Sequence, residues 1–207
     1  MTLSSWLRDK FDQVLHPSAS DRVLLSELEF LLVDVDLTGT DINQDSVIGL
    51  AALPLVEGRF APDALRYCRF APSSIHGFAD APGVAEDYQA ILEVMAGRTV
   101  FTVNPTFVQH MLVEAVSRRQ LPTPEGKWLD LSAAAGVVGS DAIPVTSLAY
   151  WQAQMKIRGR HAHDAVYDVF AMAQLLQALL AYAEDEGIET LADLMRNQSA
   201  EAWMRPF

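Results

Sequence analysis

The 207-residue sequence predicts a single α/β domain built on a mixed β-sheet, and the order of its strand-like and helix-like segments carries this prediction. Residues 29–37 form an apolar run interrupted only by two aspartates, which is typical of a central strand buried on both faces. Two more strand-like segments follow, at 47–56 and about 59–70, and the turn at Glu57-Gly58 between them indicates a hairpin. Strands and helices then alternate, which favours a mixed sheet flanked by helices.

The remaining elements are expected from hydrophobic spacing and turn residues. We expect short strands at 99–103 and 127–131, a loop from Gly136 to Pro144, and helices at 3–15, about 85–96, about 105–119, 147–156, 164–185 and 189–196. A break at residues 16–20 separates the first helix from the rest. The predicted organisation is therefore a helical appendage at 1–20, the main domain at 21–186, and a C-terminal helix and tail at 187–207.

Composition excludes several classes of protein. Half of the residues are hydrophobic and only 20% are charged, so the chain is not a disordered polymer. The single cysteine, Cys68, cannot form an internal disulfide, which favours a reducing cytoplasm. The first fifteen residues lack the apolar core of a signal peptide, and no apolar run approaches the roughly 20 residues that span a bilayer. We expect a cytoplasmic protein without a membrane segment.

The charge balance restricts how the chain could bind nucleic acid. Lys and Arg number 15 against 27 Asp and Glu, which gives a net charge of −12. A general basic surface for long nucleic acid needs clustered Lys and Arg and is excluded by this balance. Local binding of a strand end, or metal ions that bridge acidic side chains to phosphates, remains compatible with it.

Two carboxylates fall on one face of the first predicted strand. Side chains alternate along a strand, so Asp34 and Asp36 share a face with Leu32 and Thr38 and lie roughly 7 Å apart. They repel each other and each loses hydration on burial, and a divalent cation between them removes both penalties. The alternative is an ordinary strand end, where Asp36 with Thr38 and Gly39 starts a turn.

A second acidic signal lies at the start of the long helix near the C-terminus. If Asp164 caps this helix, Asp168 falls in its first turns within an apolar stripe. A buried ionised carboxylate needs a partner, and a metal ion is an obvious one. His163, just before the helix, could act over the same site as a general base. The alternative is a solvated acid at the edge of the stripe beside a surface histidine.

Together these residues predict carboxylates from a central strand and a late helix that converge on divalent metal ions. Ligands that are all oxygen favour Mg²⁺ or Mn²⁺ over Zn²⁺. A pair of such ions suits phosphoryl transfer with water as the nucleophile.

Several motifs occur in one order over residues 28–182. They are Asp34-Val35-Asp36-Leu37-Thr38-Gly39, then Asp41, Asp45 and Val47-Ile48-Gly49, then Ser74-Ile75-His76-Gly77-Phe78-Ala79-Asp80, then Asn104-Pro105-Thr106-Phe107, and finally His163 with Asp168. This order resembles the DEDD 3′–5′ exonucleases, in the subgroup with a catalytic histidine. That subgroup includes the proofreading subunit of bacterial replicative polymerases.

The resemblance implies a ribonuclease-H-like α/β fold, with a mixed five-stranded sheet flanked by helices and both aspartates on its central strand. It implies a metal-dependent exonuclease that uses Mg or Mn and releases nucleoside 5′-monophosphates from a single-stranded DNA or RNA 3′ end. In this pattern Asp34 bridges both ions, Asp36 and Asp168 complete the first metal site, and His163 takes the proton from the attacking water.

The same resemblance suggests which residues contact the substrate. Thr38 would position the terminal nucleotide, and Asn104 and Phe107 of the second motif would line the substrate site. His76 would line the groove as well, although a histidine that stabilises a turn is an equal alternative.

The sequence departs from the family pattern at two positions. The family's glutamate is Asp36 here, one methylene shorter but still able to bind a metal. The second motif ends in Val108 where the family has an aspartate, and valine cannot ligate a metal. We therefore expect weak occupancy of the second metal site and weakened activity. The alternative function is a catalytically degenerate domain kept as a binding or regulatory module.

Overall fold

The protein, represented by a computed structural model, is described here for residues 22–70, 82–138 and 164–195. These residues form a sheet of six strand segments in the order β3-β2-β1-β5-β6, with β4 also paired to β2. The strands are β1 (Phe30–Leu37), β2 (Val47–Val56), β3 (Arg59–Phe60), β4 (Arg66–Arg69), β5 (Thr99–Thr102) and β6 (Trp128–Asp130). The helices are α2 (Val84–Met95), α3 (Pro105–Ser117), α4 (Leu131–Val138) and α6 (Ala165–Asp185), with short 3-10 turns η2 (Leu25–Glu27) and η3 (Pro62–Ala64).

Strand β1 is the centre of this sheet. It pairs antiparallel with β2 on one side and parallel with β5 on the other. Both β3 and β4 pair with β2 along its remaining edge, so they occupy one strand position in two pieces. The sheet thus has five strand positions, is mixed, and carries Asp34 and Asp36 on its central strand, as the sequence predicted.

The structure corrects the predicted elements at two places. The segment 59–70 is not one strand, because η3 interrupts it at Pro62, whose ring fixes φ and whose nitrogen carries no hydrogen for a strand ladder. Helix α4 was not predicted, and its last residues, 136–138, replace the start of the expected loop. The helices expected at 3–15 and 147–156 lie outside the described residues.

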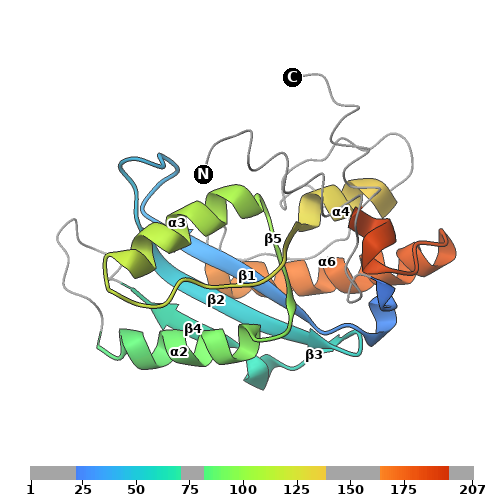
Figure 1. The fold of residues 1–207 in the computed structure, drawn as a ribbon, viewed down its shortest axis with the longest axis horizontal. Coiled ribbons are helices and arrows are strands. Elements are labelled where there is room, and N and C mark those ends of the chain that lie inside the picture. The colour runs from blue at the N-terminus through green and yellow to red at the C-terminus, as the bar shows by residue number, and fades with distance from the viewer. Residues whose placement is uncertain (1–21, 71–81, 139–163, 196–207) are drawn as a thin grey trace.

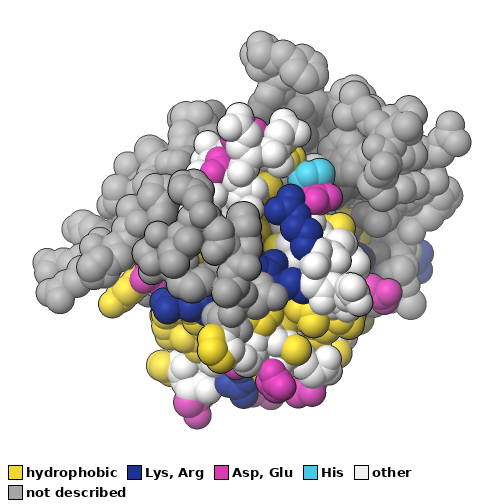
Figure 2. Space-filling view, turned by 90° about the vertical axis from the view of Figure 1, so that its left-hand side faces the viewer, with side chains coloured by type: hydrophobic (Ala, Val, Ile, Leu, Met, Phe, Trp, Pro, Cys, Tyr) yellow, Lys and Arg dark blue, Asp and Glu magenta, His cyan; other side chains and the backbone are white. Residues whose placement is uncertain are grey.

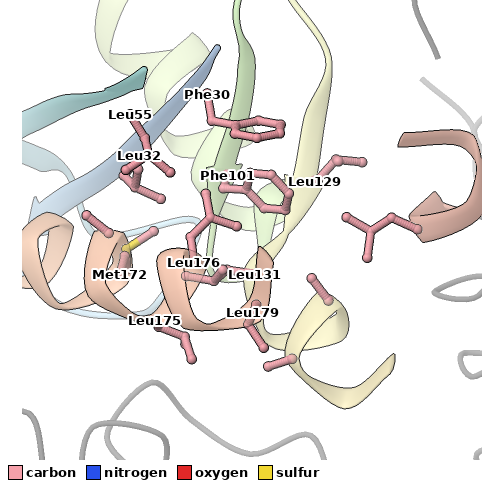
Figure 3. Packing of buried hydrophobic residues seen from close by; sticks show 14 of the residues in the cluster. Phe30, Leu32, Leu55, Phe101, Leu129, Leu131, Met172, Leu175, Leu176 and Leu179 are labelled. Carbon is pink, nitrogen blue, oxygen red and sulfur yellow. The ribbon is translucent and has the colours of Figure 1, made fainter. Parts of the chain in front are cut away.

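Helices cover both faces of the sheet (Figure 1). On one face, α6 packs against β1 and β2 through a cluster that includes Leu32, Phe101, Met172 and Leu176 (Figure 3). Residues from the segment after α6 belong to the same cluster, among them Leu191 and Leu194. The backbone N–H of Leu25 donates to the carbonyl of Glu189 at 2.8 Å, which joins the start of the described chain to its end.

The other face of the sheet is covered by α2 and α3. Its buried cluster includes Leu31 and Val33 of β1, Ile91 of α2 and Leu112 of α3. Neighbouring residues of β1 therefore point into different cores, which explains why the strand is apolar on both faces.

Among the described helices, α6 is long and apolar enough by length and composition to cross a membrane. Its apolar residues Val169, Met172, Leu176 and Leu179 are buried in the cluster with the sheet. Core packing therefore accounts for its hydropathy.

Candidate active site

The two aspartates of β1 lie on the sheet face that α6 covers. Leu32 belongs to the α6 cluster, whereas Leu31 and Val33 belong to the cluster of α2 and α3. Because side chains alternate along a strand, Asp34 and Asp36 follow Leu32 onto the α6 face. Apolar packing ends there, and both aspartates are half-buried at the carboxyl-terminal end of β1.

Asp34 and Asp168 come together from β1 and α6. Burial raises the pKa of Asp34 well above its usual range, and the negative charge of Asp168 raises it further. A hydrogen bond involving the Val35 backbone opposes the rise, and the charge of Asp36 adds to it. Asp34 of β1 and Asp168 of α6 therefore lie close enough for their charges to interact, which favours a proton or a cation between the two groups. Their convergence on metal ions stays a prediction.

Asp36 uses both of its oxygens within the protein. Its Oδ1 accepts a hydrogen bond from the Ala165 backbone N–H at 2.6 Å, and its Oδ2 accepts one from the Tyr67 hydroxyl at 3.1 Å. Tyr67 comes from β4, across β2 from Asp36. Burial raises the pKa of Tyr67, and the charge of Asp36 raises it further, so the phenol remains the proton donor.

Gly49 makes room for this contact. It lies opposite Asp36 in the β1–β2 ladder and opposite Arg69 in the β2–β4 ladder. A Cβ atom at Gly49 would lie 2.6 Å from Asp36 Oδ2 and would overlap the Tyr67 hydroxyl. The absence of a side chain at this position is therefore what allows Tyr67 to reach the aspartate.

The first turn of α6 is capped by two carboxylates. Asp164 is the N-cap, and its Oδ1 accepts from the backbone N–H groups of Val166 at 3.1 Å and Tyr167 at 3.4 Å. This confirms the predicted capping role of Asp164. Asp36 takes the preceding N–H, that of Ala165. Two negative groups at a helix N-terminus are also favoured by the helix dipole.

The donor set fits a cation only in part. Asp34 and Asp168 offer oxygen ligands of the kind that Mg²⁺ and Mn²⁺ prefer. Across residues 22–70, 82–138 and 164–195, however, no group of three His, Cys, Asp or Glu side chains is arranged to hold a metal ion. His163 and His76 lie outside the described residues. Their roles, and that of Asp36 as a ligand, stay predictions.

Thr38 is part of a closed loop that follows β1. Its hydroxyl donates to Asp45 Oδ1 at 2.8 Å and accepts from the Ser46 N–H at 3.0 Å. Asp45 Oδ2 accepts from the Asp41 N–H at 2.8 Å, and Asp41 in turn accepts from the Asn43 N–H at 2.9 Å. The two loop aspartates therefore shape the turn beside the site, and the loop holds the Thr38 hydroxyl in place.

The second motif begins α3. Asn104 adopts a left-handed conformation, with φ 55° and ψ 65°, and its side chain accepts from the Phe107 N–H at 3.4 Å. This makes Asn104 the N-cap of the helix. Val108 is only 4% exposed and packs in the cluster that contains Leu31 and Val33. The Val108 side chain thus packs between α3 and the sheet, on the face of the sheet opposite α6.

Tyr67 was not predicted as part of the site. Alternation along β4 places it on the face opposite buried Cys68, which is readable from the sequence. Its contact with Asp36 depends on the registers of two strand pairs, which no local pattern specifies.

The sequence matches no protein-family model and no curated protein. Solved structures with a similar fold include several nucleases. Exonuclease I of E. coli in complex with a dT13 oligonucleotide is 14% identical with a TM-score of 0.59, over 77% of this chain and 42% of that one. Exonuclease X in complex with 5′ overhanging duplex DNA is 17% identical with a TM-score of 0.53, over 80% of this chain and 99% of that one.

Cell-death related nuclease 4 is similar as well, with 16% identity and a TM-score of 0.55 over 78% of this chain and 66% of that one. This chain spans less than half the length of exonuclease I. At such identities the likeness establishes the fold, which is the mixed sheet flanked by helices that ribonuclease-H-like exonucleases share.

We predict that Gly49→Ala destabilises the protein by about 1–3 kcal/mol, because the new methyl group displaces the Tyr67 hydroxyl and Asp36. In a Tyr67→Phe background the same substitution should cost less, because the hydroxyl is gone. Urea unfolding of the four proteins of this cycle measures the coupling. An equal cost in both backgrounds would mean that the hydroxyl does not occupy this space.

We also predict a pH-dependent gain in stability for Asp34→Asn in the absence of divalent cations. The pKa of Asp34 is raised in the folded state, so between the unfolded and folded pKa values the folded state binds more protons than the unfolded one. Stability contributed by this group therefore falls as pH rises through that window. The variant should be more stable than wild type at pH 7, and the difference should shrink towards pH 4.

The measurement is urea unfolding in EDTA from pH 4 to pH 7. Asp185→Asn, at the exposed end of α6, serves as the matched control and should change stability by less than about 0.5 kcal/mol. A difference between Asp34→Asn and wild type that is the same at every pH would contradict the raised pKa of Asp34 in the folded protein.

Proposed function

We propose that this chain is a metal-dependent nuclease of the 3′–5′ exonuclease type, acting on the ends of single-stranded nucleic acid and releasing nucleoside 5′-monophosphates. The observation that carries the proposal is the position of Asp34 at the end of the central strand, where burial and the nearby charge of Asp168 on α6 both raise its pKa. The pair joins the first and last motifs of the predicted site, which lie far apart in the sequence.

The electrostatics of the pair favour a divalent cation. When two carboxylates lie close together and are shielded from water, ionising both costs free energy. A positive charge between them removes that cost. Asp34 and Asp168 would hold Mg²⁺ or Mn²⁺. When bound, the ion would supply charge neutralisation at the phosphate and a more acidic water.

The other predicted residues have distinct tasks in this proposal. His163, next to the N-cap Asp164, takes the proton from the attacking water. Thr38 and Asn104 lie at the ends of β1 and β5, which run parallel in the sheet. They would contact the terminal nucleotide together with Phe107 and His76.

The structural neighbours support a nucleic-acid substrate. Exonuclease I and exonuclease X adopt the same fold with DNA bound, and a zinc-bound form of the exonuclease I–DNA complex is known. Figure 2 shows Lys and Arg side chains gathered near the middle of one face despite the net charge of −12. A cytoplasmic location and a kinship with the polymerase proofreading subunit belong to the same proposal.

A second candidate function is a degenerate exonuclease domain that acts as a binding or regulatory module. Two observations favour it. Val108 is buried in an apolar cluster where the family pattern has a carboxylate, and Asp36 has both oxygens engaged by the protein. Such a module would bind nucleic acid without cleaving it.

Nuclease assays with 5′-labelled single-stranded DNA and RNA oligonucleotides in Mn²⁺ distinguish the two functions. We expect wild type to shorten one of the oligonucleotides stepwise from the 3′ end, and Asp34→Asn to lose about 100-fold or more of that rate. Asp185→Asn is the control for charge loss and should match wild type. Identical traces from wild type and Asp34→Asn would contradict catalysis at this site, and binding without cleavage would favour the module.

A further inference from the structure

We propose that Asp36 acts as a structural clamp in this protein and is not a metal ligand. With Tyr67, it holds the first turn of α6 against β1 and so positions Asp168 opposite Asp34. The inference rests on the proposed function only in those experiments that measure cation binding. Asp36 occupies the place of a metal-binding glutamate in the sequence pattern, so the clamp is a different use of that position.

The hydrogen bonds of Asp36 are the first argument. The bond from the Ala165 N–H to Oδ1 is 2.6 Å long, a short contact of the kind made by charged acceptors. The Tyr67 hydroxyl donates a hydrogen bond to the second oxygen, Oδ2, at an oxygen–oxygen distance of 3.1 Å. The carboxylate is thus aimed at the helix terminus.

The needs of the helix terminus are the second argument. The first N–H groups of a helix have no partner within the helix. Asp164 accepts from Val166 and Tyr167, and Asp36 accepts from Ala165. Ala165 is fully buried, so its N–H depends on Asp36 for a hydrogen-bond partner. An aspartate that left this position for a metal ion would strand a buried donor.

The link to Asp168 follows from helix geometry. Asp168 lies one turn after Ala165, and its N–H donates to the Asp164 carbonyl at 2.9 Å. Fixing Ala165 against β1 therefore fixes the rotation of the first turn and the direction of the Asp168 side chain. Asp34 lies two residues before Asp36 on the same face of β1, so one strand carries both the clamp and the partner.

Side-chain length is the third argument. The Asp36 carboxylate already lies 2.6 Å from the Ala165 nitrogen, and the side chain of Tyr67 closes its other end. A glutamate in the same rotamer would carry its carboxylate one methylene further, away from the positions at which these two bonds form. The shorter residue therefore suits the clamp.

The test compares two substitutions of the same residue by titration calorimetry with Mn²⁺. Asp36→Asn keeps an oxygen for the Ala165 N–H, and the Tyr67 hydroxyl can turn to accept from the new amide. Asp36→Ala removes both contacts. For a clamp, Asp36→Asn should bind Mn²⁺ within about fivefold of wild type, and Asp36→Ala should bind at least about tenfold more weakly. Asp34→Asn should also lose binding.

For a metal ligand, Asp36→Asn and Asp36→Ala should both lose binding as Asp34→Asn does, because an amide oxygen replaces a charged ligand poorly. That result would overturn the clamp. Tyr67→Phe provides a second variant that keeps the aspartate, and it should weaken Mn²⁺ binding about threefold through the looser clamp. Tyr182→Phe, exposed on α6, is its matched control and should bind as wild type.

Amide hydrogen exchange separates this inference from the proposed function. The Ala165 amide should be protected in wild type and in Asp36→Asn, and should exchange at least about tenfold faster in Asp36→Ala, with no metal present. If wild type fails to bind Mn²⁺, the proposed function fails and this exchange pattern still decides the clamp. Equal protection of Ala165 in wild type and Asp36→Ala would overturn it.

Discussion

The burial of Asp34 at the end of β1, close to the negative charge of Asp168 on α6, sets the constraint on which the site depends. Burial disfavours the charged form of Asp34, and the neighbouring charge of Asp168 disfavours it further. Such a pair persists only if the surrounding structure holds it and if a proton or a cation relieves it. The fold meets the first condition, and the proposed metal ion meets the second.

The fold holds the pair by fixing one helix against one strand. The apolar face of α6 is buried on β1 and β2 through residues such as Met172 and Leu176. That packing sets the distance between helix and sheet, and the carboxylates of Asp36 and Asp164 satisfy the first N–H groups of the helix where the apolar packing ends. The site thus lies at the edge of the core, where the packed helix and strand hold the polar side chains in place.

Much of this arrangement could be predicted from the sequence because it depends on local periodicity. The alternation of side chains along a strand predicted that Asp34 and Asp36 lie on one face of a central strand. The start of the long helix predicted that Asp164 caps it and that Asp168 lies in its first turns. The meeting of Asp34 with Asp168 required an assumption about how the helix lies on the sheet. The motif order supplied that assumption, and in the structure the charge of Asp168 raises the pKa of Asp34.

Features that depend on long-range register could not be predicted in the same way. The contact of Tyr67 with Asp36 requires the β1–β2 and β2–β4 registers together and a glycine at position 49. The burial of Val108 in the α3 cluster depends on the rotation of that helix against the sheet. The sequence shows a proline at position 62, where the strand is interrupted. Because an edge strand tolerates proline, this residue alone could not show whether the segment forms one strand or two.

The most direct test of the central pairing is the anomalous diffraction of a crystal of the whole chain soaked in Mn²⁺. A peak should lie between the carboxylates of Asp34 and Asp168, at oxygen–metal distances of about 2.2 Å. The Asp36 carboxylate should remain on the Ala165 N–H and the Tyr67 hydroxyl. An absence of anomalous density between Asp34 and Asp168, in a crystal in which Mn²⁺ occupies other carboxylates, would contradict the assignment of these two aspartates as the cation-binding pair.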